Sequence, residues 1–124
     1  MLCISYNPHY QSALKDLKHS TRQRFISVEF DYPPADVEAE IVQNESGCTS
    51  DQAEALAKLG EKVRNLREHG LQEGASTRLL IYAGRLMSQG IKPRRACQVA
   101  IVWTLTDEAE LQRSVEEVVT SIFE

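Results

Sequence analysis

Apolar residues recur at helical spacing, between helix-breaking residues, over most of the chain after Pro33. This spacing of apolar residues predicts amphipathic helices, which pack against one another to bury their apolar stripes. The sequence predicts five helices, at residues 33–44, 49–69, 76–89, 93–105 and 107–124. The predicted fold class is therefore mainly α, with a helical bundle over residues 33–124.

Local signals mark the predicted helix starts. Thr49 and Gln52 fit a capping box, Ser76 fits an N-cap, and Asp107 with Glu110 can cap the last helix. We expect the helix at residues 93–105 to lie at the centre of the bundle, because it is apolar over most of its circumference. The stripes predicted to be buried are Val37 and Ile41; Ala53, Leu56, Leu59, Val63 and Leu66; Leu79, Leu80, Ala83, Leu86 and Met87; Ala96, Val99, Ala100 and Trp103; and Leu111, Val115, Val118, Val119 and Ile122.

Two short strands are predicted before the helices. Leu2–Tyr6 is apolar, partly β-branched and stopped by Asn7-Pro8, and residues 25–30 alternate so that Ile26, Val28 and Phe30 share one face. Neither run has an obvious hairpin partner. Residues 1–32 are thus expected to be distinct from the bundle and to need strands from elsewhere to complete a sheet.

Composition excludes several classes of function. The net charge of -4 over 124 residues argues against nucleic-acid binding, which needs concentrated positive charge. A helix-turn-helix with Arg94 and Arg95 near DNA ranks last, because its second helix is too apolar to lie in a groove. Short apolar runs predict no membrane insertion. The three cysteines have no CxxC spacing, so we expect a reduced, cytoplasmic protein without a metal site.

No catalytic motif is complete within the chain. It has no Ser-His-Asp order, no HExxH and no GxxxxGK[ST], so it cannot by itself hold a nucleoside triphosphate with magnesium. Polar residues do lie at the ends of predicted elements: Asn7, Arg22, Arg24 and Arg78. Arg78 falls in the first turn of a helix, where its cation adds to the positive dipole end and suits the gripping of an anion. A solvated or ion-paired side chain is the alternative for each arginine.

The order of these features resembles the second half of a MoxR-type AAA+ ATPase, and more closely the CbbQ/NorQ/NirQ group. The segments that carry the resemblance are Ile4-Ser-Tyr-Asn-Pro8 with Tyr10-Gln11, Leu14-Lys-Asp-Leu-Lys18, Ser20-Thr-Arg-Gln-Arg-Phe25, and Gly74-Ala-Ser-Thr-Arg-Leu-Leu80 onward through Trp103. The resemblance covers most of the chain. It implies that residues 1–32 are the end of the α/β nucleotide-binding core and that residues 33–124 are the helical lid.

The resemblance also implies roles for individual residues. Asn7 matches sensor 1, which orients the attacking water, and Arg78 matches sensor 2, which reaches the γ-phosphate from the lid. Arg24 matches the arginine finger offered to a neighbouring subunit, with Arg22 as the alternative. The chain departs from the family pattern at His9, where the family usually has glycine.

The family's full-length form is expected to use ATP and Mg²⁺, to form a hexameric ring, and to work with a von Willebrand A-type partner on a client, either rubisco or a metalloenzyme such as nitric oxide reductase. Walker A and Walker B would precede Met1. The chain is therefore expected to be a C-terminal fragment that binds no nucleotide tightly and does not hydrolyse ATP alone. The alternative is a stand-alone helical adaptor that binds a partner without nucleotide.

Overall fold

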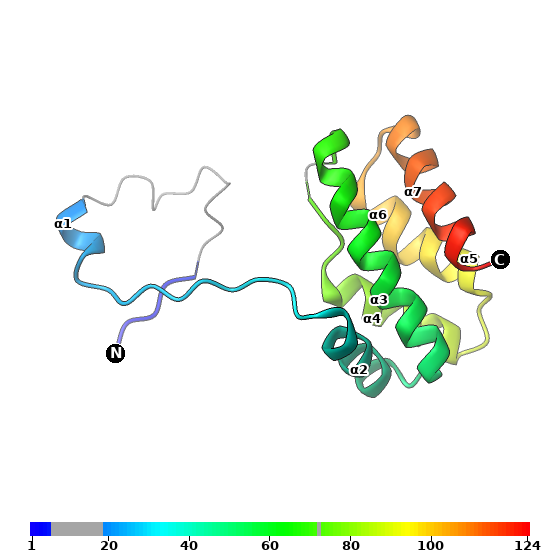
Figure 1. Cartoon of the computed structure of the whole chain (residues 1–124), viewed down its shortest axis with the longest axis horizontal. Coiled ribbons are helices and arrows are strands. Elements are labelled where there is room, and N and C mark those ends of the chain that lie inside the picture. Colours follow the sequence, from blue (N-terminus) through cyan, green and yellow to red (C-terminus); the bar gives the residue numbers. More distant parts are fainter. Residues whose placement is uncertain (6–18, 72) are drawn as a thin grey trace. The chain divides into compact units, whose positions relative to one another are not determined.

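The chain divides into two units, Met1–Asp31 and Tyr32–Glu124. The computed structural model describes residues 1–5, 19–71 and 73–124, and Figure 1 traces both units along the sequence.

The two predicted strands are absent from the described part of the first unit. Residues 2–5 and 25–30 have no strand assignment, and α1 (His19–Arg22) is a single helical turn. The side chains of Ile26, Val28 and Phe30, predicted to share one face of a strand, are all exposed. A strand is stable only when neighbouring strands take up its N–H and C=O groups. The two predicted strands are therefore not shown, since alternation indicates that a segment suits a sheet and does not supply the neighbouring strands that complete it.

The second unit is a bundle of helices, which confirms the mainly α fold class. Its longest helix, α3, packs against α2, α4 and α7, and the π-helical turn η3 contacts α4 and α7 (Figure 1). The elements are α2 (Ala35–Ser46), α3 (Ser50–Asn65), the 3-10 turn η2 (Leu66–His69), α4 (Thr77–Ser88), α5 (Pro93–Cys97), η3 (Gln98–Val102), α6 (Trp103–Leu105) and α7 (Ala109–Ile122).

Two of the three predicted helix caps are present. Thr49 and Gln52 form the reciprocal capping box of α3, with N···O distances of 3.1 and 3.2 Å. Ser76 is the N-cap of α4, and its hydroxyl accepts from the backbone N–H of Leu79. The prediction at the last helix was wrong, because Glu108 is the N-cap of α7 and provides no side-chain cap.

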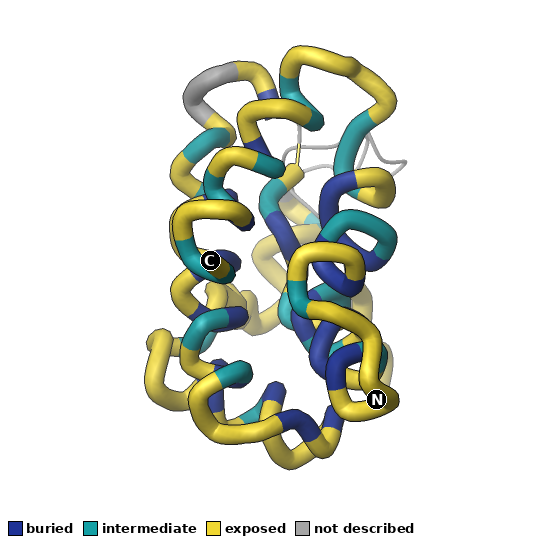
Figure 2. Tube along the Cα trace, turned by 90° about the vertical axis from the view of Figure 1, so that its right-hand side faces the viewer, coloured by how far each residue is buried: buried dark blue, intermediate teal, exposed yellow. Residues whose placement is uncertain are grey.

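The core lies between the inward faces of the helices, where Figure 2 shows the buried positions. The register predicted for α2 was wrong: Val37 is exposed and Ile41 is half-buried, whereas Glu38, Ala39 and Val42 are buried. The helix therefore turns toward the bundle a face that includes a carboxylate. The largest apolar side chains that are fully buried are Val42, Leu56, Leu59, Val63, Leu80, Ile101, Val102 and Val115.

The predicted helix at residues 93–105 is interrupted by the π turn η3. Ala96, Cys97, Ala100, Ile101 and Val102 are buried, in line with its position in the core, but Trp103 is 46% exposed. One extra residue in a turn rotates everything after it by about 100° relative to a regular α-helix. This rotation carries Trp103 off the stripe that regular spacing predicted.

A close approach between α2 and α4 occurs at Gly84. A Cβ atom there would lie 2.6 Å from Oγ of Ser46, so only glycine fits. The Ser46 hydroxyl is itself satisfied, because it donates to the carbonyl of Val42 and accepts from the N–H of Cys48 at 3.2 Å. Glycine at position 84 therefore allows α4 to approach α2 closely at Ser46.

Within the described residues, no helix is long and apolar enough to cross a bilayer.

The three cysteines differ in exposure, and this predicts their reactivity. Cys3 is exposed, Cys48 and Cys97 are buried, and burial raises the pKa of the Cys97 thiol to about 12. Because the thiolate is the reactive form, Cys97 stays neutral and protected at and well above neutral pH. Iodoacetamide in native buffer is expected to label Cys3 first, and the other two only after unfolding. Peptide mass spectrometry measures this, and labelling of native Cys97 as fast as Cys3 would contradict the buried position.

Candidate functional site around the start of α4

Arg78 is the second residue of α4 and follows a capped helix start. Its side chain is exposed and has no hydrogen-bond or ion-pair partner among the described residues. The first turn of α4 contains no acidic residue. The positive end of the helix dipole and the Arg78 guanidinium therefore lie in one place, a setting that favours an anion.

A buried ion pair lies beneath this helix start. Glu38 of α2 is 1% exposed, and its carboxylate accepts from both terminal nitrogens of Arg64 of α3, at 2.9 and 2.8 Å. The Arg64 side chain is 13% exposed. A carboxylate buried so deeply is stable only when paired and fully hydrogen-bonded. The two-pronged contact meets this requirement and ties α2 to α3.

The same two side chains also hold the segment that leads into α4. Oγ1 of Thr77 donates to Oε2 of Glu38 at 2.7 Å, and Nε of Arg64 donates to the carbonyl of Ala75 at 2.9 Å. Ala75 is fully buried. We call Glu38, Arg64 and Thr77 the anchoring cluster. It joins α2, α3 and the start of α4 through four hydrogen bonds.

Neighbouring groups pack tightly around the anchoring cluster. The Tyr32 ring covers the Arg64 guanidinium, 3.7 Å from the ring centroid, in a cation–π contact. A Cβ atom at Gly74 would lie 2.8 Å from Cγ of Arg64, and one at Gly60 would lie 2.8 Å from Cδ1 of Leu80. An open cavity of about 260 Å³ adjoins the cluster and is lined by Tyr32, Pro33, Pro34, Ala35, Glu38, Ala57, Glu61, Arg64 and Asn65.

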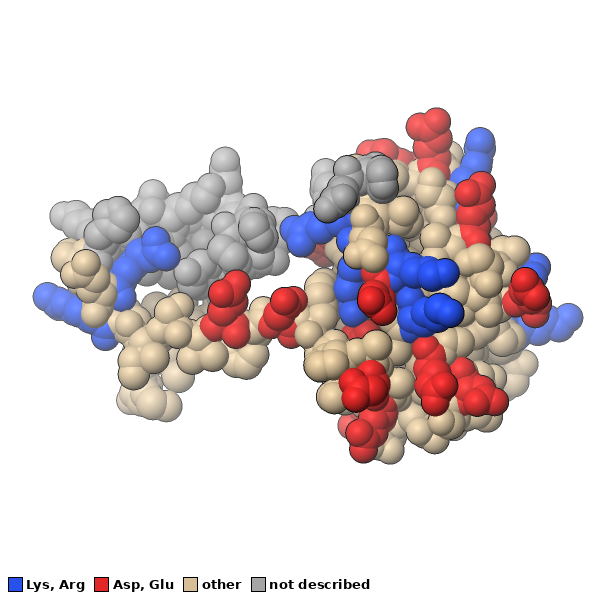
Figure 3. All heavy atoms as spheres, in the orientation of Figure 1, with Lys and Arg blue, Asp and Glu red and all other residues tan. Residues whose placement is uncertain are grey.

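Arg94 and Arg95 both have hydrogen-bond partners in the helical unit, whereas Arg78 has none among the described residues. Nε of Arg94 donates to the carbonyl of Phe123 at 2.7 Å. Arg95 donates to Oε1 of Gln98 at 2.6 Å, and its guanidinium lies 4.9 Å from the Trp103 ring centroid. These contacts favour a structural role for both. Figure 3 shows both signs of charge interspersed over the visible face of the helical unit.

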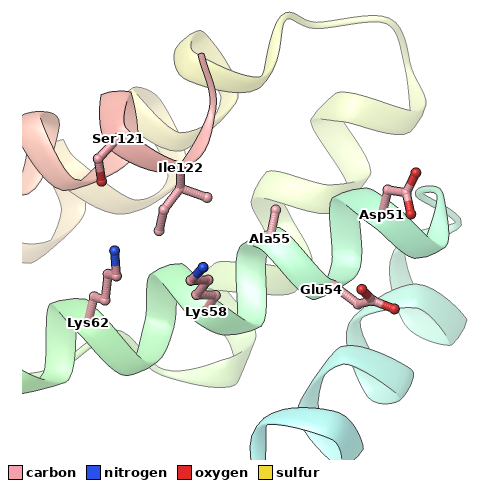
Figure 4. A pocket seen from close by; sticks show the side chains of 7 residues that line it. All are labelled: Asp51, Glu54, Ala55, Lys58, Lys62, Ser121 and Ile122. Carbon is pink, nitrogen blue, oxygen red and sulfur yellow. The ribbon is translucent and has the colours of Figure 1, made fainter.

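A second open cavity, of about 320 Å³, lies between α3 and the end of α7. Figure 4 shows Lys58 and Lys62 extending from α3 on the side of Ser121 and Ile122, while Asp51 and Glu54 lie farther along the helix. The mixed charges lining it identify no particular ligand. No group of three or more potential metal ligands occurs among the residues that the structure describes.

The other candidate residues belong to the first unit. Arg22 ends α1, and Arg24 follows in a turn in which its N–H donates to the carbonyl of Thr21 at 3.2 Å. Both side chains are exposed. Asn7 lies outside the described residues. Arg78 belongs to the second unit, so the structure does not test whether these four residues share a site, and their roles stay predictions.

Comparison with known protein families shows which family the chain belongs to. A profile of the CbbQ/NirQ/NorQ C-terminal domain matches residues 38–122, more than half of the chain. The chain belongs to the CbbQ/NirQ/NorQ family. The match begins at Glu38 and includes the anchoring cluster, the whole of α4 and Arg78. The family resemblance stated from the sequence is thereby confirmed.

Individual members of the CbbQ/NirQ/NorQ family are similar along nearly the whole chain. Protein CbbQ of Hydrogenophilus thermoluteolus is 48% identical over 98% of the chain, and the denitrification regulatory protein NirQ of Pseudomonas aeruginosa is 50% identical over 96%. Protein NorQ of Paracoccus denitrificans is 46% identical over 99%. The chain covers 46% of the length of each of these proteins, so it spans just under half of the curated relatives it matches.

Sequence reasoning missed the anchoring cluster. The signal was present but weak: Glu38 lies four residues before Val42, so a helical stripe through Val42 also passes through a carboxylate. The partner, Arg64, directly follows the buried Val63 and is 26 residues away. A prediction from periodicity places charged residues on the solvent-facing side of a helix. The spacing of apolar residues also does not indicate which distant residue could pair with a buried charge.

Proposed function

We propose that this chain is the lid region of a CbbQ-type AAA+ ATPase, in which Arg78 binds the γ-phosphate of ATP held by the preceding nucleotide-binding core. The full protein would couple ATP hydrolysis to remodelling of a client enzyme, a metalloenzyme or rubisco, within a hexameric ring and with a von Willebrand A-type partner. The observation that carries the proposal is the exposed guanidinium of Arg78, which has no partner among the described residues and lies in the first turn of a helix whose start is hydrogen-bonded to Glu38.

Membership of the CbbQ/NirQ/NorQ family supports the proposal, since the matched profile covers the C-terminal domain of that family. The chemistry supports it as well. A guanidinium offers five donors in a planar fork that suits phosphate oxygens, and it stays charged at every physiological pH. The chain has no GxxxxGK[ST], so the phosphate-binding loop and magnesium site would come from the preceding core. Asn7 as sensor 1 and Arg24, or alternatively Arg22, as the finger belong to the same proposal.

A fusion protein tests this function. The part of Hydrogenophilus thermoluteolus CbbQ that this chain does not cover is joined ahead of residue 1, and ATP hydrolysis is measured for the fusion and for the chain alone. We expect hydrolysis from the fusion only. Arg78→Ala is expected to lower its kcat by roughly tenfold or more, because a hydrogen bond to a charged group contributes about 1.5–3 kcal/mol.

The matched control is Arg113→Ala. Arg113 is an exposed arginine of α7 that has no hydrogen-bond or ion-pair partner in the described part of the chain. Its loss should leave kcat unchanged. A fusion that assembles and hydrolyses ATP equally well with and without Arg78 would contradict the proposed role, and partner binding by the isolated chain without nucleotide would favour the adaptor alternative.

A further inference from the structure

We propose that the anchoring cluster of Glu38, Arg64 and Thr77 is a positioning device that fixes the start of α4 and so aims Arg78 at its anionic ligand. This inference rests on the proposed function, in which that ligand is the nucleotide γ-phosphate. None of the three residues is assigned as a ligand contact. They act through the backbone that carries Arg78.

Three consecutive residues before Arg78 are held individually. The carbonyl of Ala75 accepts from Arg64, the hydroxyl of Ser76 accepts from the N–H of Leu79, and the hydroxyl of Thr77 donates to Glu38. Arg78 is the next residue along the chain. Its Cα position is therefore set by contacts on all three preceding residues, and its side chain is left exposed.

The cluster itself cannot shift easily. Glu38 and Arg64 come from two different helices and are joined by two short hydrogen bonds, at 2.9 and 2.8 Å. Close packing at Gly74 and the Tyr32 ring over the guanidinium leave little room for another Arg64 conformation. A buried, fully satisfied polar network of this kind favours one arrangement over others.

Physical chemistry gives a reason for such anchoring. A cation in the first turn opposes the helix dipole, so Arg78 weakens the start of its own helix. Helix ends also fray readily when nothing holds them. An arginine that must meet a phosphate gains from a fixed starting position, since misplacement by about 1 Å can cost roughly a hundredfold in rate. The anchoring cluster offsets the unfavourable interaction of Arg78 with the helix dipole, and it gives Arg78 a fixed starting position.

Thr77→Val is the sharpest test variant. Valine keeps the shape of threonine but cannot donate to Glu38, whose two oxygens keep their contacts with Arg64. The buried charge thus stays paired, and the fold is not put at risk. Thr120→Val, at an exposed threonine of α7, is the matched control. Each variant is made in the CbbQ fusion with Arg78 present and with Arg78→Ala.

We expect Thr77→Val to lower kcat of the fusion by about tenfold when Arg78 is present. In the Arg78→Ala background we expect less than about a twofold change, because two residues acting through one contact are not additive. A comparable fall in both backgrounds would overturn the positioning role while leaving the proposed function intact. No effect of Arg78→Ala itself would overturn the proposed function, and this inference with it.

A second measurement needs no nucleotide. Amide hydrogen exchange on the chain alone is expected to be about tenfold faster at Leu79 and Leu80 in Thr77→Val, since their N–H groups belong to the first turn that Thr77 anchors. Thr120→Val should leave these rates unchanged. Unchanged exchange at Leu79 and Leu80 in Thr77→Val would show that the hydroxyl does not hold the helix start, and would overturn the inference independently of any ATP assay.

Discussion

Replacing Glu38 by alanine is expected to lower the free energy of unfolding of the helical unit by about 3–5 kcal/mol. The variant leaves the Arg64 guanidinium without its carboxylate, at a position where the side chain is only 13% exposed. It also removes the acceptor of the Thr77 hydroxyl. A largely buried charge without a partner lowers the free energy of unfolding far more than the loss of a solvent-exposed ion pair does, because an exposed pair contributes only about 0–1 kcal/mol.

Thermal and urea unfolding measure this loss. For a unit of this size, about 1 kcal/mol corresponds to a shift of roughly 4–8 °C in Tm, so a fall of more than ~10 °C is expected. The matched control is Glu40→Ala, two residues along the same helix, where the side chain is exposed. That change should stay within about 0.5 kcal/mol of the parent chain.

A double variant separates the cost of a broken pair from the contribution of the intact pair. Glu38→Met with Arg64→Met replaces both charges by long, unbranched apolar side chains, and replacing a buried ion pair by apolar residues is often neutral or stabilising. We expect it to recover most of the stability lost in Glu38→Ala. If Glu38→Ala proved no more destabilising than Glu40→Ala, the carboxylate would not be buried and paired as the structure shows.

Helix positions and two caps were predictable from the sequence because their causes are local. The capping box of Thr49 and Gln52, and the N-cap at Ser76, depend on residues within one turn of each other. The apolar stripe of α3 likewise needs only regular spacing, and Ala53, Leu56, Leu59 and Val63 are all buried.

The failures arise where the cause is distant. Ile26, Val28 and Phe30 alternate like a strand, but a strand needs partners that the described part of the chain does not supply. The π turn that exposes Trp103 breaks the regular spacing on which the stripe prediction depended. In α2 the predicted register was displaced by the pairing of Glu38 with a residue 26 positions away, which periodicity cannot detect.

In the candidate site, too, only the residue whose position has a local cause could be predicted from the sequence. Arg78 could be identified from the sequence because its position in a first turn follows from the Ser76 cap. The anchoring cluster that holds this turn could not, since Glu38 and Arg64 read as ordinary surface charges on two separate helices. Sequence reasoning therefore identified the residue proposed to meet the ligand and missed those proposed to aim it.

Discrimination between ATP and ADP tests the role of Arg78 more directly than hydrolysis does. If the guanidinium contacts the γ-phosphate, it contributes to binding of ATP and contributes little to binding of ADP. A charge-assisted hydrogen bond is stronger than a neutral one, at about 1.5–3 kcal/mol, which corresponds to roughly a tenfold to hundredfold change in Kd. Arg78→Lys should recover part of the loss, because lysine keeps the charge but not the planar fork.

The decisive measurement is the pair of dissociation constants for a non-hydrolysable ATP analogue and for ADP, determined by calorimetry on the CbbQ fusion with and without Arg78→Ala. We predict that the variant weakens binding of the ATP analogue by about tenfold or more and changes the Kd of ADP by less than about twofold. An equal change for both nucleotides, or no change for either, would contradict the assignment of Arg78 as the lid residue that contacts the γ-phosphate.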